Sequence, residues 1–550
     1  MSARTSENAS PEAIDVEELE AGTATASVID WPFEPVVRRR LGRRVLDRAR
    51  AGQRDLIALA GTVVPLTILH AWGMTRFPAF FDDEGAYVSQ AFAVDKLHAL
   101  APYTYWYDHP PLGWILLGAW AKVVPVFTSS SFAVGASRSF TLLLFAISAG
   151  LLYGIARRLA LRPGLSALAV ALFGLSPLAL DYQRMVLLDN IAVPWLLAAF
   201  FLALTPRRRM AAYAGSAVCF ALAILTKETF LLFLPALALA VWSTCARSTR
   251  RFAMAVFATL LVCVAGFYPL FALLRGELFE GKHHTSLMYG IHFQLTRKGS
   301  GSILSAHSPT RDLIGTWLKL DPILLTIAVV LIPILLAMRR VRWVGLALVV
   351  PVLMALRPGS YVPAMYVIGL LPFAALGLAV AAAEAVAASR TATRPKVLRA
   401  AFAAAAVLLV AVPAGVAAPL WIKKDVSMVR TNDASSDEKA VAWLNAHAPH
   451  NSRILVDATV WTDLVDRGFD RKRVVWFYKL DLDPTYRMPW WRFDYVVRSD
   501  LLAGNLNWLP RSRAVFEHSR LAAAFTTPNG RIEVRRVVAR NGATRRTAGG

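Results

Sequence analysis

The chain has 550 residues, of which 56% are hydrophobic and 18% are charged, and its mean hydropathy is +0.46. A soluble protein of this length divides into domains with polar surfaces, which so apolar a composition does not supply. The formal net charge of +23 would suit a nucleic-acid-binding protein, but most Arg and Lys residues lie in short clusters between apolar runs. These properties exclude the soluble globular class and predict a polytopic membrane protein.

The first 54 residues are predicted to form a disordered cytoplasmic tail. The first 35 are rich in Ala, Ser, Thr and Glu, a composition that buries little apolar surface. Eight arginines follow between Arg38 and Arg54, before the first apolar run. That run begins too late in the chain for a signal peptide, so we expect an uncleaved first span.

Apolar runs of about 16–25 residues, long enough to cross a hydrocarbon core, predict about eleven transmembrane helices in an all-α domain over residues 55–420. They lie at 56–74, 139–156, 164–180, 187–204, 211–226, 229–245, 252–274, 322–338, 342–356, 361–386 and 400–420. If the N-terminus is inside, arginine-rich clusters follow the even-numbered spans at 157–162, 207–209, 247–251, 339–342 and 390–399. All these clusters then fall on the cytoplasmic side, as the positive-inside rule requires.

One apolar stretch, Pro111–Val126, would reverse this alternation if it crossed the membrane. It contains Trp114, Trp120 and Lys122, and aromatic-rich amphipathic helices of this kind lie in the membrane interface. We therefore expect it to lie along the outer surface. Three regions then face outward, at about residues 75–137, 275–320 and everything after 421.

The segment after the last span is predicted to form a small extracytoplasmic α/β domain over residues 421–540. Asp437–Ala446 has the pattern of an amphipathic helix. Three short runs rich in β-branched and aromatic residues predict strands at Arg453–Asp457, Val474–Tyr478 and Tyr495–Arg498. A disordered basic tail is expected at 541–550.

Three consecutive carboxylates, Asp82, Asp83 and Glu84, follow the first span. Close to a low-dielectric interface, mutual repulsion and desolvation raise at least one of their pKa values, which suits a general base. The alternative is a solvated acidic loop. About 25 residues further on, the chain reads Tyr-Asp-His-Pro-Pro-Leu-Gly-Trp, with His109 at its centre.

These two motifs resemble those of membrane glycosyltransferases of the GT-C fold, above all the protein O-mannosyltransferases and the lipid A aminoarabinose transferases. Asp181–Asn190 is similar to a second motif of that family, and Leu225–Glu228 is similar to the Leu-Thr-Lys that closes a later span. The resemblance covers roughly residues 55–235. The triple acid leaves the matching aspartate ambiguous between Asp82 and Asp83, of which we take Asp83. Asn190 stands where a further carboxylate would be expected, which puts a metal-binding role in doubt.

The resemblance implies an inverting glycosyltransferase that takes a sugar from a polyprenyl-phosphate donor. The acceptor would be a protein, a lipid or a cell-wall glycan at the outer face of the cell membrane, and no nucleic acid is implied. Asp83 is the expected general base, and Glu84 would orient the acceptor or tune Asp83. Asp181 and Asp189 form the second acidic motif, and His109 would fix the interfacial helix near the donor.

Lone basic residues at the outer ends of spans run against the positive-inside bias and predict contacts with the donor phosphate. Arginine suits bidentate phosphate contact and lysine acts as a point charge, whereas simple snorkelling is the alternative. The candidates are Arg184, Lys227 and Arg357. His283, His284 and His292 have a spacing compatible with a divalent metal, but contact with a head group or an ordinary polar loop fits them better, so no cofactor is indicated.

Two other functions compete with the transferase. A transporter or lipid flippase would carry charges in mid-span or paired interrupted helices in two related halves, whereas here the charges gather at outer ends. A non-catalytic scaffold would leave the acidic motif and Arg184 without a purpose. The sequence therefore favours the glycosyltransferase, with a transporter or flippase as the alternative.

Overall fold

The computed structural model of the protein describes residues 35–281, 285–528 and 530–538. The chain divides into two units, residues 1–54 and 55–550, and apart from the first part of helix α1 the features discussed below lie in the second. Helix α1 (Pro35–Ala71) begins at Pro35, so the arginine cluster that the sequence assigned to a disordered tail is helical. The rest of that predicted tail, His283, His284 and the predicted tail at 541–550 lie outside the described residues.

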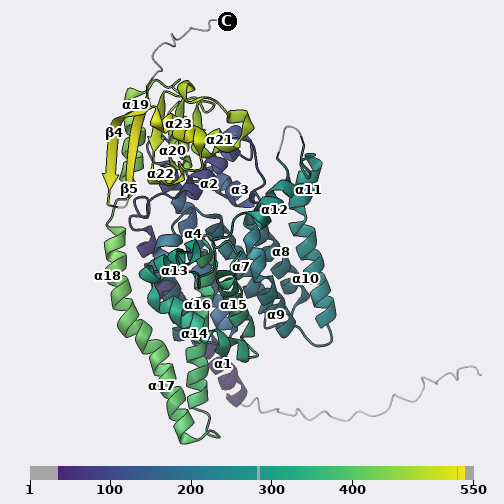
Figure 1. Cartoon of the computed structure of the whole chain (residues 1–550). Helices are drawn as coiled ribbons and strands as arrows, with labels where there is room; N and C mark the ends of the chain where they lie inside the picture. The colour runs from purple at the N-terminus through teal and green to yellow at the C-terminus, as the bar shows by residue number, and fades with distance from the viewer. Residues whose placement is uncertain (1–34, 282–284, 529, 539–550) are drawn as a thin grey trace, which may run out of the picture. The chain divides into compact units, whose positions relative to one another are not determined.

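Apolar helices make up most of the second unit (Figure 1). They are α4 (Ala133–Arg158), α5 (Pro163–Leu175), α6 (Pro177–Tyr182), α7 (Leu188–Ala203), α8 (Met210–Thr226), η2 (Glu228–Phe233), α9 (Leu234–Thr244), α10 (Arg250–Ala265), α11 (Phe267–Leu274), α14 (Pro322–Ala337), α15 (Arg342–Leu356), α16 (Tyr366–Ser389), α17 (Lys396–Val412), η3 (Pro413–Ala417) and α18 (Ala418–Val429). Two more helices, α12 (Leu287–Thr296) and α13 (Pro309–Leu320), lie in the predicted second outer loop.

Each predicted apolar run falls on helical segments, but many of these segments are short. Within the described residues, five helices are long and apolar enough to cross a membrane, or six if α13 and α14, which meet at 115°, count as one broken span. Several of the other apolar helices have only 10–17 residues. The multi-pass helical architecture is therefore confirmed, whereas the number of eleven spans stays a prediction.

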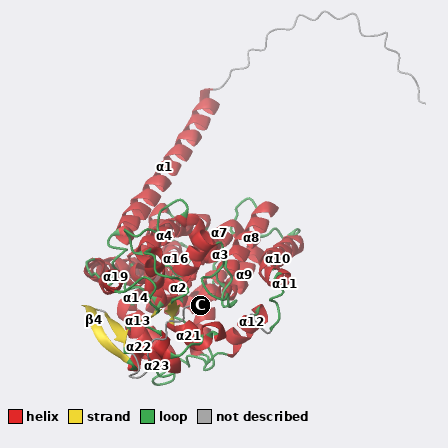
Figure 2. Ribbon diagram, turned by 90° about the horizontal axis from the view of Figure 1, so that it is seen from above, coloured by secondary structure: helices red, strands yellow, loops and turns green. Residues whose placement is uncertain are grey.

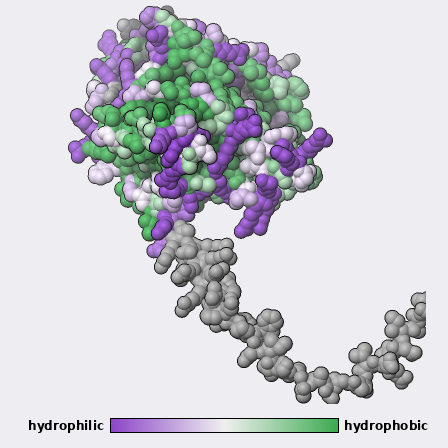
Figure 3. Space-filling model, turned by 90° about the horizontal axis from the view of Figure 1, so that it is seen from below, coloured by the Kyte–Doolittle hydropathy of each residue, from purple (hydrophilic) through white to green (hydrophobic). Residues whose placement is uncertain are grey.

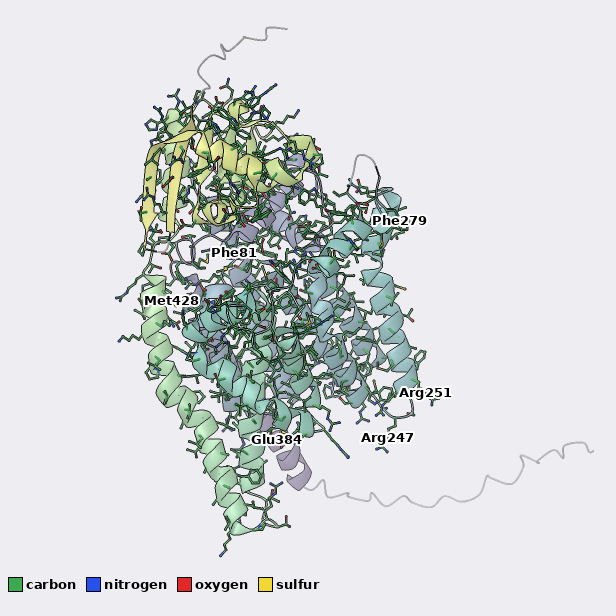
Figure 4. The ribbon with its side chains drawn as sticks, in the orientation of Figure 1. Phe81, Arg247, Arg251, Phe279, Glu384 and Met428 are labelled. Atoms are coloured by element: carbon green, nitrogen blue, oxygen red, sulfur yellow. The ribbon has the colours of Figure 1, made fainter. Side chains whose placement is uncertain are left out.

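The surface of the helical part suits lipid rather than water. Large apolar side chains are exposed along α10 and α17, such as Val262 at 70% and Val407 at 63%. Contiguous apolar surface of this kind is costly in water and favourable in a bilayer. The end of the helices remote from the sheet carries hydrophilic side chains between apolar areas (Figure 3). Arg247, Arg251 and Glu384 lie at that end, whereas Phe81 and Met428 lie next to the sheet domain (Figure 4).

Residues 75–137, the predicted first outer loop, form two short helices beside the C-terminal α/β domain at 435–537, which we call the outer domain after its predicted location. Helix α2 (Asp82–Phe92) continues into a π-helical turn, η1 (Ala93–Leu97), and packs against α3 (Leu112–Ala121). Helix α3 has ten residues and is therefore about 15 Å long, half the thickness of a hydrocarbon core. This length supports the prediction that Pro111–Val126 does not cross the membrane.

The C-terminal segment forms an α/β domain around a five-stranded sheet of order β2-β1-β3-β5-β4, and Figure 2 shows β4 at its rim. Its elements are α19 (Ser435–His447), β1 (Ile454–Val456), α20 (Ala458–Asp466), β2 (Val474–Trp476), α21 (Phe477–Leu482), η4 (Pro484–Tyr486), η5 (Trp490–Arg492), β3 (Tyr495–Arg498), α22 (Asp500–Asn505), α23 (Pro510–Glu517), β4 (Ser519–Thr527) and β5 (Gly530–Val537). Strand β1 pairs in parallel with β2 and β3, and β5 pairs antiparallel with β3 and β4. The predicted helix and three strands fall on α19, β1, β2 and β3, whereas β4 and β5 were not predicted.

The outer domain docks on α2 with almost no space between the two backbones. A Cβ atom added at Gly85 would lie 2.3 Å from the Thr459 nitrogen and 2.6 Å from its Cα atom. Only glycine therefore permits α2 to approach the first turn of α20 this closely. This contact brings the acidic end of α2 to the carboxyl end of β1, the strand between β2 and β3, where the strand order reverses and open α/β sheets commonly bind ligands.

Candidate active site

A lysine, a histidine and a glutamate from two distant segments form a hydrogen-bonded chain. Lys227, at the end of α8, places its Nζ atom 2.9 Å from Nε2 of His109, whose Nδ1 lies 3.0 Å from both carboxyl oxygens of Glu228. An ammonium group has donors only, so Nε2 accepts and the Nδ1 proton is donated to Glu228. Lys227 is 3% exposed, which makes it a nearly buried cation.

Asp83, on the first turn of α2, lies within electrostatic reach of Lys227 and His109. Burial raises the pKa of Asp83 above its usual value, and Lys227, followed by His109 and Arg297, opposes that rise. Burial favours the protonated carboxyl and the nearby cations favour the carboxylate. Because burial has the larger effect, this group binds a proton more readily than an exposed aspartate does. This combination suits a group that must accept a proton beside an anionic leaving group.

Glu84, the next residue, is enclosed and fully engaged. Its carboxylate forms a bidentate ion pair with Arg138 of α4, at 2.9 and 2.7 Å, and neither side chain is exposed. It also accepts the backbone N–H groups of Val186 and Phe81, at 2.8 and 3.0 Å. The pair therefore ties α2, α4 and the segment before α7 together.

Asp82 faces the outer domain rather than the lysine. Burial, followed by the nearby carboxylates of Asp83 and Asp457, raises the pKa of Asp82 well above its usual value. Asp457 directly follows β1, is 3% exposed and has one buried carboxyl oxygen, Oδ1, without a hydrogen-bond partner among the described residues. Tyr478, which follows β2, lies near enough to Asp82 and Asp83 for both carboxylates to raise the pKa of its hydroxyl, after burial as the main cause. The outer domain thus forms one side of the acidic site.

The second outer loop folds over the first and brings Arg297 to the site. Thr285 donates its hydroxyl to the Tyr105 carbonyl at 2.7 Å, and Gln294 of α12 donates to the Asp108 carbonyl at 3.1 Å. Arg297, just after α12, stacks over the Tyr361 ring at 3.5 Å and lowers the pKa of Asp83. Arg297 is thus a cation beside Asp83 that the sequence analysis did not single out.

The structure separates Arg184 and Arg357 from the group around Asp83. Arg184 is 2% exposed and donates to the backbone carbonyls of Leu69 and Phe77, at 2.7 and 3.4 Å. The carboxylates that act on the charge of Arg184 are Asp425 and Asp181. Arg357 ends α15 as an exposed side chain. Contact of these two arginines with a donor phosphate stays a prediction.

The two aspartates of the second acidic motif have different neighbours: Asp181 acts on Arg184, whereas Asp189 lies near Lys227. Asp189, at the start of α7, is 2% exposed, lies within electrostatic reach of Lys227 and His109, and has a buried Oδ2 atom without a hydrogen-bond partner among the described residues. Asn190 donates its amide to the carbonyls of Tyr182 and Met185, both at 2.7 Å. Asp189 therefore belongs with Lys227, His109 and Glu228, which we call the lysine group, and Asn190 closes the turn before α7.

The pKa values at the domain contact predict a pH-dependent docking of the outer domain. Burial raises the pKa of Asp457 to about 6 and that of Asp437 to about 7, against an ordinary value of 3.8. The folded state therefore binds protons that the unfolded state releases, so stability falls as the pH rises from about 4 to about 7. We expect Asp457→Asn to raise the apparent melting temperature at about pH 8 and to have little effect at about pH 4.5. Glu517→Gln, an exposed carboxylate of the same domain, is the matched control, and an equal effect of both variants at both pH values would contradict the prediction.

Comparison with known proteins bears on the fold. Residues 108–272 match the family model described as dolichyl-phosphate-mannose-protein mannosyltransferase. The structure is similar to that of ArnT from Cupriavidus metallidurans bound to undecaprenyl phosphate, with a TM-score of 0.52 and 15% identity over 87% of this chain and 97% of that one. No curated protein matches the sequence.

A weaker likeness, with a TM-score of 0.47 and 11% identity, relates 87% of the chain to 74% of the Archaeoglobus fulgidus oligosaccharyltransferase tethered to an acceptor peptide. The segment matched by the mannosyltransferase family contains His109, Arg138, Lys227 and Glu228, and begins at Asp108, after the acidic motif. The resemblance drawn from the sequence is therefore confirmed at the level of the fold: the chain is a multi-pass membrane protein with the GT-C glycosyltransferase fold.

Proposed function

We propose that this protein transfers a sugar from a polyprenyl-phosphate donor to an acceptor at the extracytoplasmic face of the cell membrane. The observation that carries the proposal is the raised pKa of Asp83, a carboxylate within electrostatic reach of the buried cation Lys227, which His109 and Glu228 hold in a hydrogen-bonded chain. Its support from relatives is the mannosyltransferase family model and the undecaprenyl phosphate bound to the structurally similar ArnT.

The reaction is a one-step displacement. A lone pair of the acceptor hydroxyl or amine attacks the anomeric carbon opposite the phosphate, and the bond from that carbon to the phosphate oxygen breaks. Asp83 takes the acceptor proton, and the leaving group departs as polyprenyl phosphate. Attack from the opposite face inverts the anomeric configuration.

Lys227 and Arg297 would stabilise the charge that develops on the leaving phosphate. His109 accepts a hydrogen bond from the Lys227 ammonium at Nε2 and donates one from Nδ1 to Glu228, so it holds the lysine in a fixed direction. Glu84 does not reach the reacting atoms, because Arg138 and two backbone N–H groups occupy its carboxylate. We assign Glu84 to positioning α2, and with it Asp83.

The acceptor side follows from the same geometry. Asp83 is within electrostatic reach of Lys227 and Arg297, and also of Tyr478 in the outer domain. The lipid of the donor must reach the site from the bilayer, which leaves the outer domain as the wall for the acceptor. The acceptor is a protein, lipid or cell-wall glycan.

Donor turnover tests the proposal. The wild type in nanodiscs would be incubated with a panel of polyprenyl-phosphate sugars, and release of polyprenyl phosphate would be measured. We expect one donor to be cleaved, and Lys227→Met to lower kcat/KM by about 100-fold or more, the usual cost of losing a group that stabilises developing charge. Lys122→Met, which removes an exposed cation at the end of α3, is the matched control and should match the wild type.

Two results would contradict the transferase. Movement of a donor lipid across the bilayer without cleavage would identify a flippase. Equal turnover by Lys227→Met and Lys122→Met would show that Lys227 has no role in the reaction.

A further inference from the structure

The outer domain carries an open depression of about 610 Å³, a volume within the range of about 300–1,000 Å³ found for ligand pockets. It lies between the segment Arg487–Trp491 and the start of α23, where Pro489 and Pro510 restrict the backbone. The lining differs from that of the candidate active site because it has arginines and tryptophans but no carboxylate.

Two tryptophans form a fixed aromatic surface in this depression. The ring of Trp490 stacks on His518 with centroids 3.8 Å apart and an angle of 13°, and it meets Trp491 edge-on at 5.7 Å. Trp490 also packs against the smaller core of the domain, whereas Trp491 is 57% exposed. An exposed, rigidly supported indole offers a flat apolar face at little entropic cost, which suits the C–H face of a sugar ring.

The arginines around the two rings are not neutralised. Arg487, Arg492 and Arg511 are exposed, and none of them forms an ion pair within the described part of the chain. The nearby carboxylate of Asp481 caps α23 instead, because it accepts the N–H groups of Arg511 and Ser512 at 2.8 and 3.0 Å. Three guanidinium groups therefore remain available for anionic groups, which they bind in bidentate geometry.

We propose that this depression binds an anionic glycan, an oligosaccharide segment whose sugar rings stack on Trp491 and whose carboxylate or phosphate groups contact Arg487 and Arg511. Charge complementarity and the aromatic face together select this ligand over a neutral glycan or an acidic peptide. A membrane surface fits less well, because α23 lies in the part of the domain away from the apolar helices (Figure 1). The site is independent of the proposed transfer reaction and would hold a cell-surface glycan near the membrane.

Calorimetric titration of the full chain in nanodiscs of neutral phospholipid tests the site. The probes are an oligogalacturonate, a phosphorylated malto-oligosaccharide and the unmodified malto-oligosaccharide of the same length. We expect one or both anionic probes to bind and the neutral probe to bind at least about tenfold more weakly, with affinity falling as salt is added. Trp491→Ala and the double change Arg487→Ser with Arg511→Ser should each weaken binding by about tenfold or more.

Trp508→Ala removes another exposed tryptophan of the same domain, at 52% exposure, and Arg520→Ser removes an exposed arginine of β4. Both control variants should bind the anionic probes as the wild type does. Equal binding of neutral and anionic probes, no binding of either, or equal losses in the control variants would overturn the proposal. Tighter binding of an oligo-aspartate peptide, or of nanodiscs that contain anionic lipid, would overturn it as well and would assign the depression to that ligand.

Discussion

Asp83→Asn is expected to lower the rate of donor cleavage by about 10²–10⁴-fold, the usual contribution of a general base. The amide is close in size to the carboxylate but cannot take the acceptor proton. The measurement is the release of polyprenyl phosphate from the donor that the wild type cleaves. Asp82→Asn is the informative comparison, because this carboxylate is adjacent and faces Asp457 instead of Lys227. We expect the smaller loss there, and the opposite ranking would assign the base to Asp82.

The pH profile gives a second, independent test of Asp83. Because burial raises its pKa, the acid limb of kcat/KM should lie above the ordinary aspartate value of about 3.9, with activity rising as Asp83 loses its proton. Lys227 lowers that pKa, so residual activity of Lys227→Met should show its acid limb at higher pH than in the wild type. An acid limb that does not move would mean that Lys227 and Asp83 do not interact in the functional state.

The membrane helices and the acidic site could be predicted because local sequence determines them. An apolar run of sufficient length has few alternatives to a helix in a bilayer, and the adjacent carboxylates at Asp82 and Asp83 remain adjacent in any fold. Lys227 and His109 could also be named, since each is a polar residue next to an apolar segment. Their direct hydrogen bond could not, because 118 residues separate them in the chain.

The residues that were missed reach the site through tertiary packing. Arg138 opens a predicted span at its outer end, so the argument applied to Arg184 would have selected it as well. Arg297 lies within a loop that contains other basic residues, and nothing local distinguishes it. Asp457 and Tyr478 meet the acidic motif because Gly85 admits the start of α20, a contact between segments more than 370 residues apart. Strands β4 and β5 were missed because their charged and small residues interrupt the apolar alternation.

Glu84→Gln is expected to destabilise the protein by about 3–5 kcal/mol, because it leaves Arg138 as an uncompensated buried charge. Both side chains of this pair are fully buried, whereas the Asp55–Arg157 pair, at 2.7 Å, is about one third exposed. Asp55→Asn is therefore the matched control, with an expected loss of about 0–1 kcal/mol. Apparent melting temperatures of the two variants in the same detergent would measure the difference.

A third variant separates positioning from chemistry. Replacing both Glu84 and Arg138 with Gln removes the charge that Glu84→Gln leaves unpaired, so part of the lost stability should return. If Glu84 only positions α2, the loss of turnover should follow the loss of stability across these variants. A Glu84→Gln protein that melts like Asp55→Asn but no longer cleaves the donor would refute the positioning role, and Glu84 would then belong to the reacting groups beside Asp83.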